Sequence, residues 1–176
     1  GLSMCASYNR QYGTRFLTAI PATVYGPGGS FDPDEAHVLS ALIRKFHEAA
    51  ERGSPEVTVW GTGRARREFL FADDLAEACE LLLDCEDVTR PINVGPGTSW
   101  TIRELAEMVA DVVGFHGSIR WDASRPEGAP AKMLDASAIQ AMGWRARTDL
   151  RDGIAQTYRW FLAHPSTVNL QPSTSS

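Results

Sequence analysis

The stretch Arg67-Glu68-Phe69-Leu70-Phe71-Ala72-Asp73-Asp74 is the most informative part of this chain, because it predicts a strand that runs straight into a helix. Residues 69–71 have the apolar and aromatic character of a buried strand. Asp73 can accept hydrogen bonds from the first free amides of a helix, and Asp74 favours the positive end of the helix dipole. A stripe at helical spacing follows, formed by Leu75, Ala78, Cys79, Leu82 and Leu83. Arg67 is therefore a cation beside a strand-to-helix corner.

The rest of the chain alternates between strand and helix patterns. Apolar runs predict strands at residues 16–24, 57–60, 92–94 and 118–121, and helical spacing predicts helices at 2–12, 34–52, 101–113, 136–142 and 150–162. Thr101 and Glu104 have the spacing of a capping box. Residues 125–132 read as a polar loop that two prolines keep out of a helix. This alternation indicates an α/β fold, in which the first part of the chain completes a parallel sheet and the rest forms a smaller lobe.

Composition excludes several classes of function. The 176 residues carry a formal net charge of -5, which argues against nucleic acid as a partner because phosphate binding needs a basic surface. No apolar run reaches the roughly 20 residues that cross a bilayer, and no signal peptide opens the chain, so we expect no membrane contact. The three cysteines lack the paired spacing of a disulfide framework or zinc site, which predicts reduced thiols in a cytoplasmic protein, with Cys79 in the core. Because the chain starts at Gly1 inside a helical pattern, we expect a fragment.

Four cations are candidates for binding a ligand: Lys45 on the inner half of a helix, Arg67 at a strand start, and Arg125 and Lys132 in a loop. Such residues can hold a diphosphate, which needs fixed donors and close approach of the backbone. The alternative for each one alone is a solvated surface charge. The sequence leaves both readings open.

Two further side chains suggest chemistry. Trp60 precedes Gly61 at a loop edge, where an indole can stack on a base or sugar, although a core tryptophan fits the same pattern. His37 stands where a loop meets a helix, and an imidazole can act as a general acid near neutral pH. A Gly-x-Gly-x-x-Gly loop and a Tyr-x-x-x-Lys pair are both absent from the 176 residues, so they lack the signal for a dinucleotide pyrophosphate site.

The order of the motifs resembles the C-terminal half of the GDP-L-fucose synthase family, which belongs to the extended short-chain dehydrogenases/reductases. The resemblance runs from Gly1 to about Leu162. The motifs that carry it are Ser7-Tyr8-Asn9-Arg10-Gln11-Tyr12-Gly13, Val24-Tyr25-Gly26-Pro27, His37-Val38, Val59-Trp60-Gly61-Thr62-Gly63, Arg67-Glu68-Phe69-Leu70, Ile92-Asn93-Val94-Gly95, Thr101-Ile102-Arg103-Glu104-Leu105 and Asp122-Ala123-Ser124-Arg125-Pro126-Glu127-Gly128.

The resemblance implies the end of a Rossmann-type parallel sheet at residues 1–30, a smaller C-terminal substrate-binding lobe at 31–165 and a disordered tail at 166–176. It implies an NADPH-dependent enzyme that epimerises GDP-4-keto-6-deoxy-D-mannose at C3 and C5 and reduces C4 to give GDP-L-fucose. His37 matches the catalytic acid. The positions that match substrate-binding residues are Val38, Leu42, Lys45, Trp60, Arg67, Glu127 and Lys132. Those that match cofactor contacts are Pro21, Ala22, Thr23, Val24 and His37.

The chain also departs from the family pattern. Lys45 replaces an arginine, Glu127 an aspartate and Thr23 an asparagine. The family's catalytic serine, tyrosine, lysine and cysteine and its glycine-rich cofactor loop correspond to sequence before Gly1, so we expect the isolated chain to bind substrate without turnover. The parent is expected to be a homodimer. Two alternatives stay open: another sugar-nucleotide epimerase or dehydratase, and a noncatalytic GDP-sugar-binding module.

Overall fold

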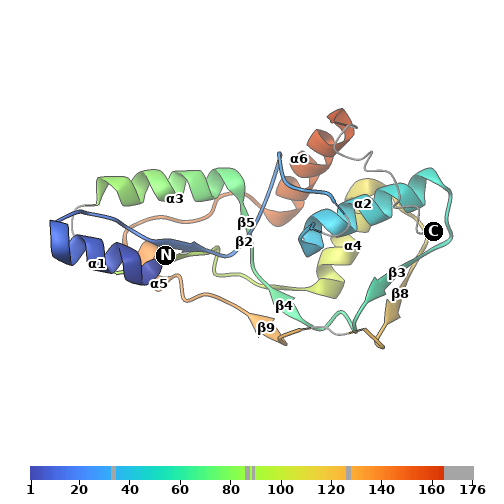
Figure 1. Cartoon of the computed structure of the whole chain (residues 1–176). Helices are drawn as coiled ribbons and strands as arrows, with labels where there is room; N and C mark the ends of the chain where they lie inside the picture. Colours follow the sequence, from blue (N-terminus) through green and yellow to red (C-terminus); the bar gives the residue numbers. More distant parts are fainter. Residues whose placement is uncertain (33–34, 86–87, 89, 126–127, 165–176) are drawn as a thin grey trace, which may run out of the picture.

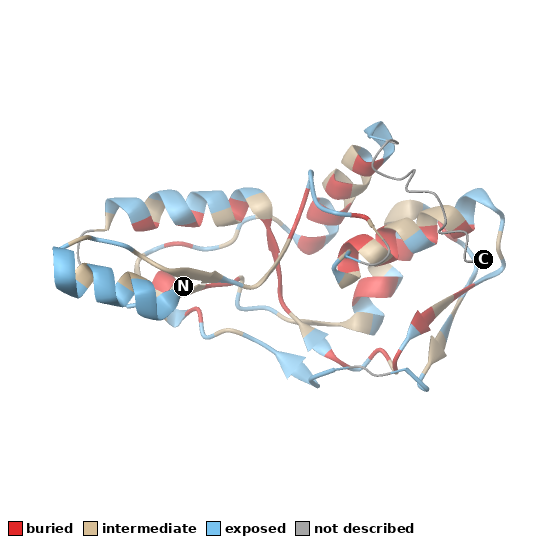
Figure 2. Cartoon of the chain, in the orientation of Figure 1, coloured by how far each residue is buried: buried red, intermediate tan, exposed pale blue. Residues whose placement is uncertain are grey.

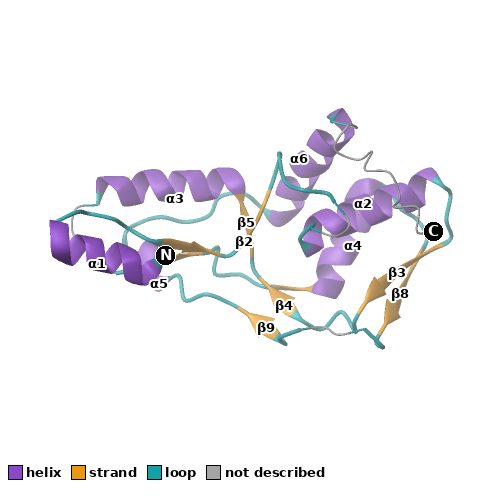
Figure 3. Cartoon of the chain, viewed as in Figure 1, coloured by secondary structure: helices purple, strands orange, loops and turns teal. Residues whose placement is uncertain are grey.

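The computed structural model describes residues 1–32, 35–85, 88, 90–125 and 128–164, which form two groups of helices joined by short strands (Figures 1 and 3). The first group contains α1 (Leu2–Tyr12), β1 (Ala19–Pro21), α3 (Ala72–Asp84), β6 (Ile92–Val94) and α5 (Ser137–Ala141). The second contains α2 (Val38–Glu51), β3 (Glu56–Trp60), α4 (Ile102–Val113), β8 (Ser118–Asp122) and α6 (Leu150–Ala163). Between them lie β2 (Thr23–Tyr25), β4 (Arg66–Arg67), β5 (Phe69–Phe71), β7 (Trp100–Thr101) and β9 (Ala131–Lys132).

Most strand pairs are parallel. β1 pairs with β6, β2 with β5 and β3 with β8, each in parallel. β4 is the middle strand of a small sheet, antiparallel to β7 and parallel to β9. Parallel pairs with helices between them in the chain define an α/β fold, which confirms the fold class predicted from the sequence.

The segment from Arg67 to Asp74 folds as a strand followed by a helix. All three residues of β5 are buried, and α3 begins at the next residue. The expected role of Asp73 is wrong, because Phe71 is the N-cap and no side chain caps this helix. Asp74 is instead buried and accepts hydrogen bonds at 3.1 Å from the backbone amides of Arg147 and Thr148. It therefore ties the start of α3 to the segment that leads into α6.

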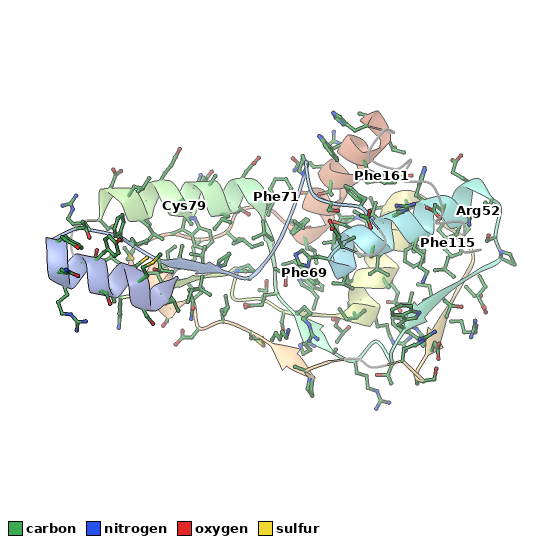
Figure 4. All side chains as sticks on the ribbon, viewed as in Figure 1. Arg52, Phe69, Phe71, Cys79, Phe115 and Phe161 are labelled. Atoms are coloured by element: carbon green, nitrogen blue, oxygen red, sulfur yellow. The ribbon has the colours of Figure 1, made fainter. Side chains whose placement is uncertain are left out.

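The stripe on α3 is narrower than the sequence suggested. The buried residues of this helix are Asp74, Ala78 and Leu82, which follow one another at a spacing of four. Cys79 is exposed, so its expected place in the core is wrong (Figure 4), and Leu83 is 79% exposed. Leu75 and Leu81 are partly buried and pack against the smaller hydrophobic cluster beside this row, so the contact face of the helix includes Leu75 and Leu81 but not Cys79 and Leu83.

Other boundaries shift for local reasons. The run 16–24 is two strands, because the amide of Ala22 donates to Val94 O at 2.8 Å and the chain then moves from β6 to β5. The helix expected from Asp34 begins at Val38. Lys132, expected in a loop, lies in β9. The capping box of Thr101 and Glu104 is confirmed, with both reciprocal bonds present. The predicted tail at 166–176 lies outside the described residues.

Two hydrophobic clusters form the core. The larger one lies among α2, α4, α6 and β3, where Phe115 and Phe161 are buried (Figure 4). The smaller one lies between α3, β6 and α5 and includes Leu70 and Ile139. Each cluster contains residues from both sides of position 30, since Tyr25 belongs to the first and Leu17 packs on the second. The division into domains at residue 30 stays a prediction.

The helix α1 differs from the others because none of its residues is buried (Figure 2). Its side chain Asn9 nevertheless fixes the following turn, donating to Phe16 O and accepting from Phe16 N, both at 2.8 Å. Within the described part of the chain, no helix is both long enough and apolar enough to pass through a bilayer.

Tyr25 lies against the one glycine of α6. A Cβ at Gly153 would be 2.8 Å from Tyr25 Cζ, and the hydroxyl would be nearer still. Burial, and then the negative charge of Asp74, raises the pKa of Tyr25, so the hydroxyl stays protonated at neutral pH. The helix and β2 can approach this closely only because residue 153 has no side chain.

We predict that Gly153→Ala destabilises the protein by about 2 kcal/mol, although alanine is the better helix former, because overpacking outweighs the propensity gain. Urea unfolding measures the change. In a Tyr25→Phe background the penalty should be smaller, since the nearest clashing atom is gone. A Gly153→Ala variant as stable as the parent would contradict the packing seen here.

Candidate functional site

A cavity of about 800 Å³ lies where β2, β4, β9 and the start of α2 meet. Four separate segments of the chain contribute to its wall. The lining residues are Pro21, Ala22, Thr23, Val24, His37, Val38, Arg67, Glu68, Lys132, Met133 and Leu134. The cavity therefore contains all five residues expected at the cofactor and, among the expected substrate residues, Val38, Arg67 and Lys132.

The backbone at the start of α2 presents His37 to the cavity. His37 is the N-cap residue, with φ -64 and ψ 157, and its carbonyl accepts the first helical bond from Ala41 at 2.9 Å. Its imidazole makes no capping bond to the helix. The ring is exposed at the cavity wall, where it can exchange a proton with a bound molecule.

Two cations, Arg67 and Lys132, are neighbours across the β4–β9 ladder. Their Cα atoms are register partners, and partners in a ladder project to the same face of a sheet. Arg67 Nη1 donates to Arg66 O at 2.7 Å and to Ala129 O at 2.8 Å, which fixes the guanidinium against the chain that leads into β9. Two adjacent positive groups in one cavity can attract the same negative charge.

A second group of cations surrounds Trp60. This tryptophan is 63% exposed, whereas tryptophan side chains in folded proteins are on average mostly buried. Lys45 Nζ lies 6.0 Å from the ring centroid and Arg125 Cζ lies 5.2 Å from it, both within cation–π range. Partial burial lowers the pKa of Lys45. The exposed ring with flanking charges favours stacking over a core role.

The pair Arg67 and Lys132 and the group around Trp60 lie close to one another along the chain. Trp60 ends β3 and pairs with Asp122 at the end of β8, while Arg66 and Ala131 pair at the start of the next ladder. Arg66 follows Trp60 by six positions, so their Cα atoms lie at most about 20 Å apart. One extended ligand could reach both groups.

Three of the expected substrate residues that the structure describes do not line the cavity, namely Leu42, Lys45 and Trp60. Leu42 is 4% exposed and belongs to the larger hydrophobic cluster, where its methyl groups pack in the core. Lys45 lies with Trp60 instead of with Arg67 and Lys132. Glu127 falls outside the described residues.

Sequence reasoning gave no role to Glu68, Met133 and Leu134, which also line the cavity. The acid Glu68 inside an otherwise apolar strand region was a usable signal, because a carboxylate there must be buried with a partner. Met133 and Leu134 carry no such signal. Among the residues that the structure describes, no three His, Cys, Asp or Glu side chains gather closely enough to hold a metal ion.

Comparison with known proteins identifies the family. Residues 1–95, more than half of the chain, match the NAD dependent epimerase/dehydratase family. The chain belongs to this family, whose members share the mixed α/β architecture described above.

The resemblance seen in the motifs is confirmed by curated relatives. GDP-L-fucose synthase 1 of Arabidopsis thaliana is 48% identical over 162 residues, which cover 92% of this chain and 50% of that protein. The chain thus spans about half the length of the curated relatives it matches.

Solved structures agree in fold. A GDP-D-glycero-L-gluco-heptose synthase from Campylobacter jejuni, solved in the presence of NADPH, is 31% identical with a TM-score of 0.77, covering 92% of this chain and 57% of that one. A GDP-L-fucose synthetase from Naegleria fowleri superposes with a TM-score of 0.88 over 94% of this chain and 54% of that one. At 24% identity, this second structure bears on the fold alone.

Proposed function

We propose that this chain is the substrate-binding part of a GDP-L-fucose synthase-like enzyme. Such an enzyme epimerises GDP-4-keto-6-deoxy-D-mannose at C3 and C5 and reduces its C4 ketone to give GDP-L-fucose. The proposal is carried by one cavity that gathers His37, Arg67 and Lys132 with the 21–24 segment. The identity of 48% with a curated GDP-L-fucose synthase supports the same substrate. The same resemblance supports a homodimeric parent enzyme in the cytoplasm.

In this proposal, different cations contact different parts of the nucleotide. Arg67 and Lys132 neutralise the diphosphate from neighbouring positions of one ladder. Trp60 offers its exposed face to the nucleoside end, and Lys45 adds positive charge beside it. The limited span between Trp60 and Arg66 supports one ligand that touches both groups.

His37 is the acid of the epimerisation in this proposal. Removal of a proton next to the ketone leaves an enolate, and the imidazolium returns a proton to carbon on the face that inverts the centre. Its position at the cavity wall, with no capping bond to occupy the ring, supports this role.

The 21–24 segment suits the nicotinamide end of NADPH, because Pro21, Ala22, Thr23 and Val24 lie along the wall that also contains His37. NADPH supplies the hydride for the C4 reduction. The 176 residues contain neither a Tyr-x-x-x-Lys pair nor a glycine-rich loop. We therefore infer that they bind the GDP-sugar and contribute His37, and that turnover needs the rest of the enzyme.

Arg67→Ala should weaken GDP binding to the chain by about 10- to 100-fold, because hydrogen bonds to charged groups contribute about 1.5–3 kcal/mol each. Isothermal titration calorimetry measures the dissociation constant. Arg52→Ala is the matched control, since Arg52 is exposed at the far end of α2 and bonds to Glu48 (Figure 4).

The nucleobase tests the substrate class in the same titration. GDP should bind more tightly than UDP if the chain comes from a GDP-sugar enzyme. UDP binding well above GDP would assign the cavity to a UDP-sugar epimerase and reject the proposal.

The pH dependence of GDP binding should show whether the positive charge of Lys45 contributes to the affinity. A lysine is charged below its pKa, and burial lowers the pKa of Lys45 from the ordinary 10.5. Its contribution is therefore present at neutral pH and lost, as pH rises, earlier than for an exposed lysine. Lys45→Arg should extend strong binding to higher pH, because a guanidinium stays charged. Identical alkaline profiles for both proteins would separate Lys45 from the ligand.

His37→Gln should lower the epimerisation rate of the complete enzyme by about 10²–10⁴-fold, the usual contribution of a general acid. Exchange of deuterium from solvent into the C3 and C5 positions measures this step separately from reduction. GDP affinity should be unchanged, since His37 is assigned to the sugar. Normal exchange in the variant would assign the acid to another residue.

A further inference from the structure

Glu68 is a buried carboxylate in the wall of the cavity to which the proposed function gives no role. The residue is 2% exposed and is the one acidic residue among the described residues that line the cavity. It stands between β4 and β5, where the chain leaves its ladder with β9 and joins β2. Burying a carboxylate costs free energy unless hydrogen bonds compensate. The bonds of Glu68 therefore indicate what the residue does.

One oxygen of this carboxylate holds the facing part of the wall. Glu68 Oε2 accepts a hydrogen bond at 2.7 Å from the backbone N–H of Leu134. The β4–β9 ladder ends with Arg67 opposite Lys132, because β5 then pairs with β2. The Glu68 side chain supplies the next link between the two segments.

The chain on either side of residues 132–134 is anchored by side chains, since Arg67 Nη1 donates to Ala129 O at 2.8 Å and Asn93 Nδ2 donates to Asp135 O at 3.0 Å, and Glu68 adds a bond within the segment itself. β9 contains two residues, Ala131 and Lys132, and both are exposed. A ladder of that length orders a chain weakly. Residues 132–134 all line the cavity, so any shift of this segment moves Lys132 relative to Arg67.

Packing does not explain the carboxylate. Glu68 Oε1 is buried and has no hydrogen-bond partner among the described residues. An unpaired buried acceptor is destabilising, and an apolar side chain of the same size would avoid that cost. What an apolar residue could not provide is the bond to Leu134.

We propose that Glu68 is a positioning residue, which through Leu134 fixes Lys132 beside Arg67 and so sets the affinity of the cavity for a diphosphate. The inference rests on the proposed function, because that function supplies the diphosphate. Glu68 itself faces no phosphate in this proposal. It acts through the backbone of the segment that carries Lys132.

The hydrogen bond from Leu134 N–H to Glu68 Oε2 is called the tether below. Two substitutions separate the effect of this tether from the effect of the charge of Glu68. Glu68→Ala removes the acceptor, whereas Glu68→Gln keeps a carbonyl oxygen that can accept the same N–H. Amide hydrogen exchange at residues 132–134 of the ligand-free chain reports the tether, and calorimetry with GDP reports the affinity. Glu68→Ala should accelerate exchange at Leu134 and weaken GDP binding about tenfold, while Glu68→Gln should stay within about twofold of the parent in both measurements.

Val109→Ala is the control for a merely structural effect. Val109 is fully buried in the larger hydrophobic cluster on α4 and does not line the cavity. Its truncation should lower the unfolding temperature and leave the GDP affinity unchanged. A loss of affinity in Val109→Ala equal to that in Glu68→Ala would mean that general destabilisation explains both, and would overturn the proposal.

The remaining outcomes are also decisive. Unchanged exchange at Leu134 in Glu68→Ala would show that no tether exists, and faster exchange with unchanged GDP affinity would show that the tether positions nothing. Weak GDP binding by Glu68→Gln with parental exchange would assign the effect to charge and overturn the proposal. Absence of GDP binding by the unmodified chain would overturn the proposed function and the affinity claim together, while the exchange data would still decide whether Glu68 holds Leu134.

Discussion

One short segment, residues 66–71, belongs to two sheets, and the rest of the structure depends on that division. Its first two residues pair with β7 and β9, and its last three pair with β2. A backbone can satisfy partners in both sheets only if it turns between them, and the turn falls on Glu68. The cavity opens at this divergence, since the partner segments β2 and β9 separate there and each forms one part of the wall.

Two buried carboxylates connect parts of the chain that are distant in sequence. Asp74 accepts the amides of residues 147 and 148, and Glu68 accepts the amide of Leu134. In both cases an acid on or next to the β5–α3 unit receives a backbone N–H from the C-terminal third of the chain. Buried amides need acceptors, and a carboxylate satisfies them more strongly than a neutral group does. These bonds hold residues 147–148 against the start of α3 and residue 134 against the junction of β4 and β5.

The charge distribution supports the same site. The chain as a whole is acidic, with a net charge of -5, yet two cations line the cavity and two more lie on Trp60. Gathering like charges is unfavourable unless a ligand of opposite charge separates them. A diphosphate that spans the two groups would do so, and two of the relatives that the chain matches are named as synthases of GDP-sugars.

The sequence alone determined the local features of this protein: the buried strand 69–71 with its helix, the capping box of Thr101 and Glu104, and the motifs that define the family. These depend on neighbours in the chain, which a sequence displays. Only the tertiary structure decided that Leu42 packs in the core, that Cys79 is exposed and that Lys45 joins Trp60 instead of Lys132. It also made Lys132 part of a strand and Glu68 part of a cavity wall. Those outcomes depend on which segments meet in space, and a spacing pattern along one helix or strand does not contain that information.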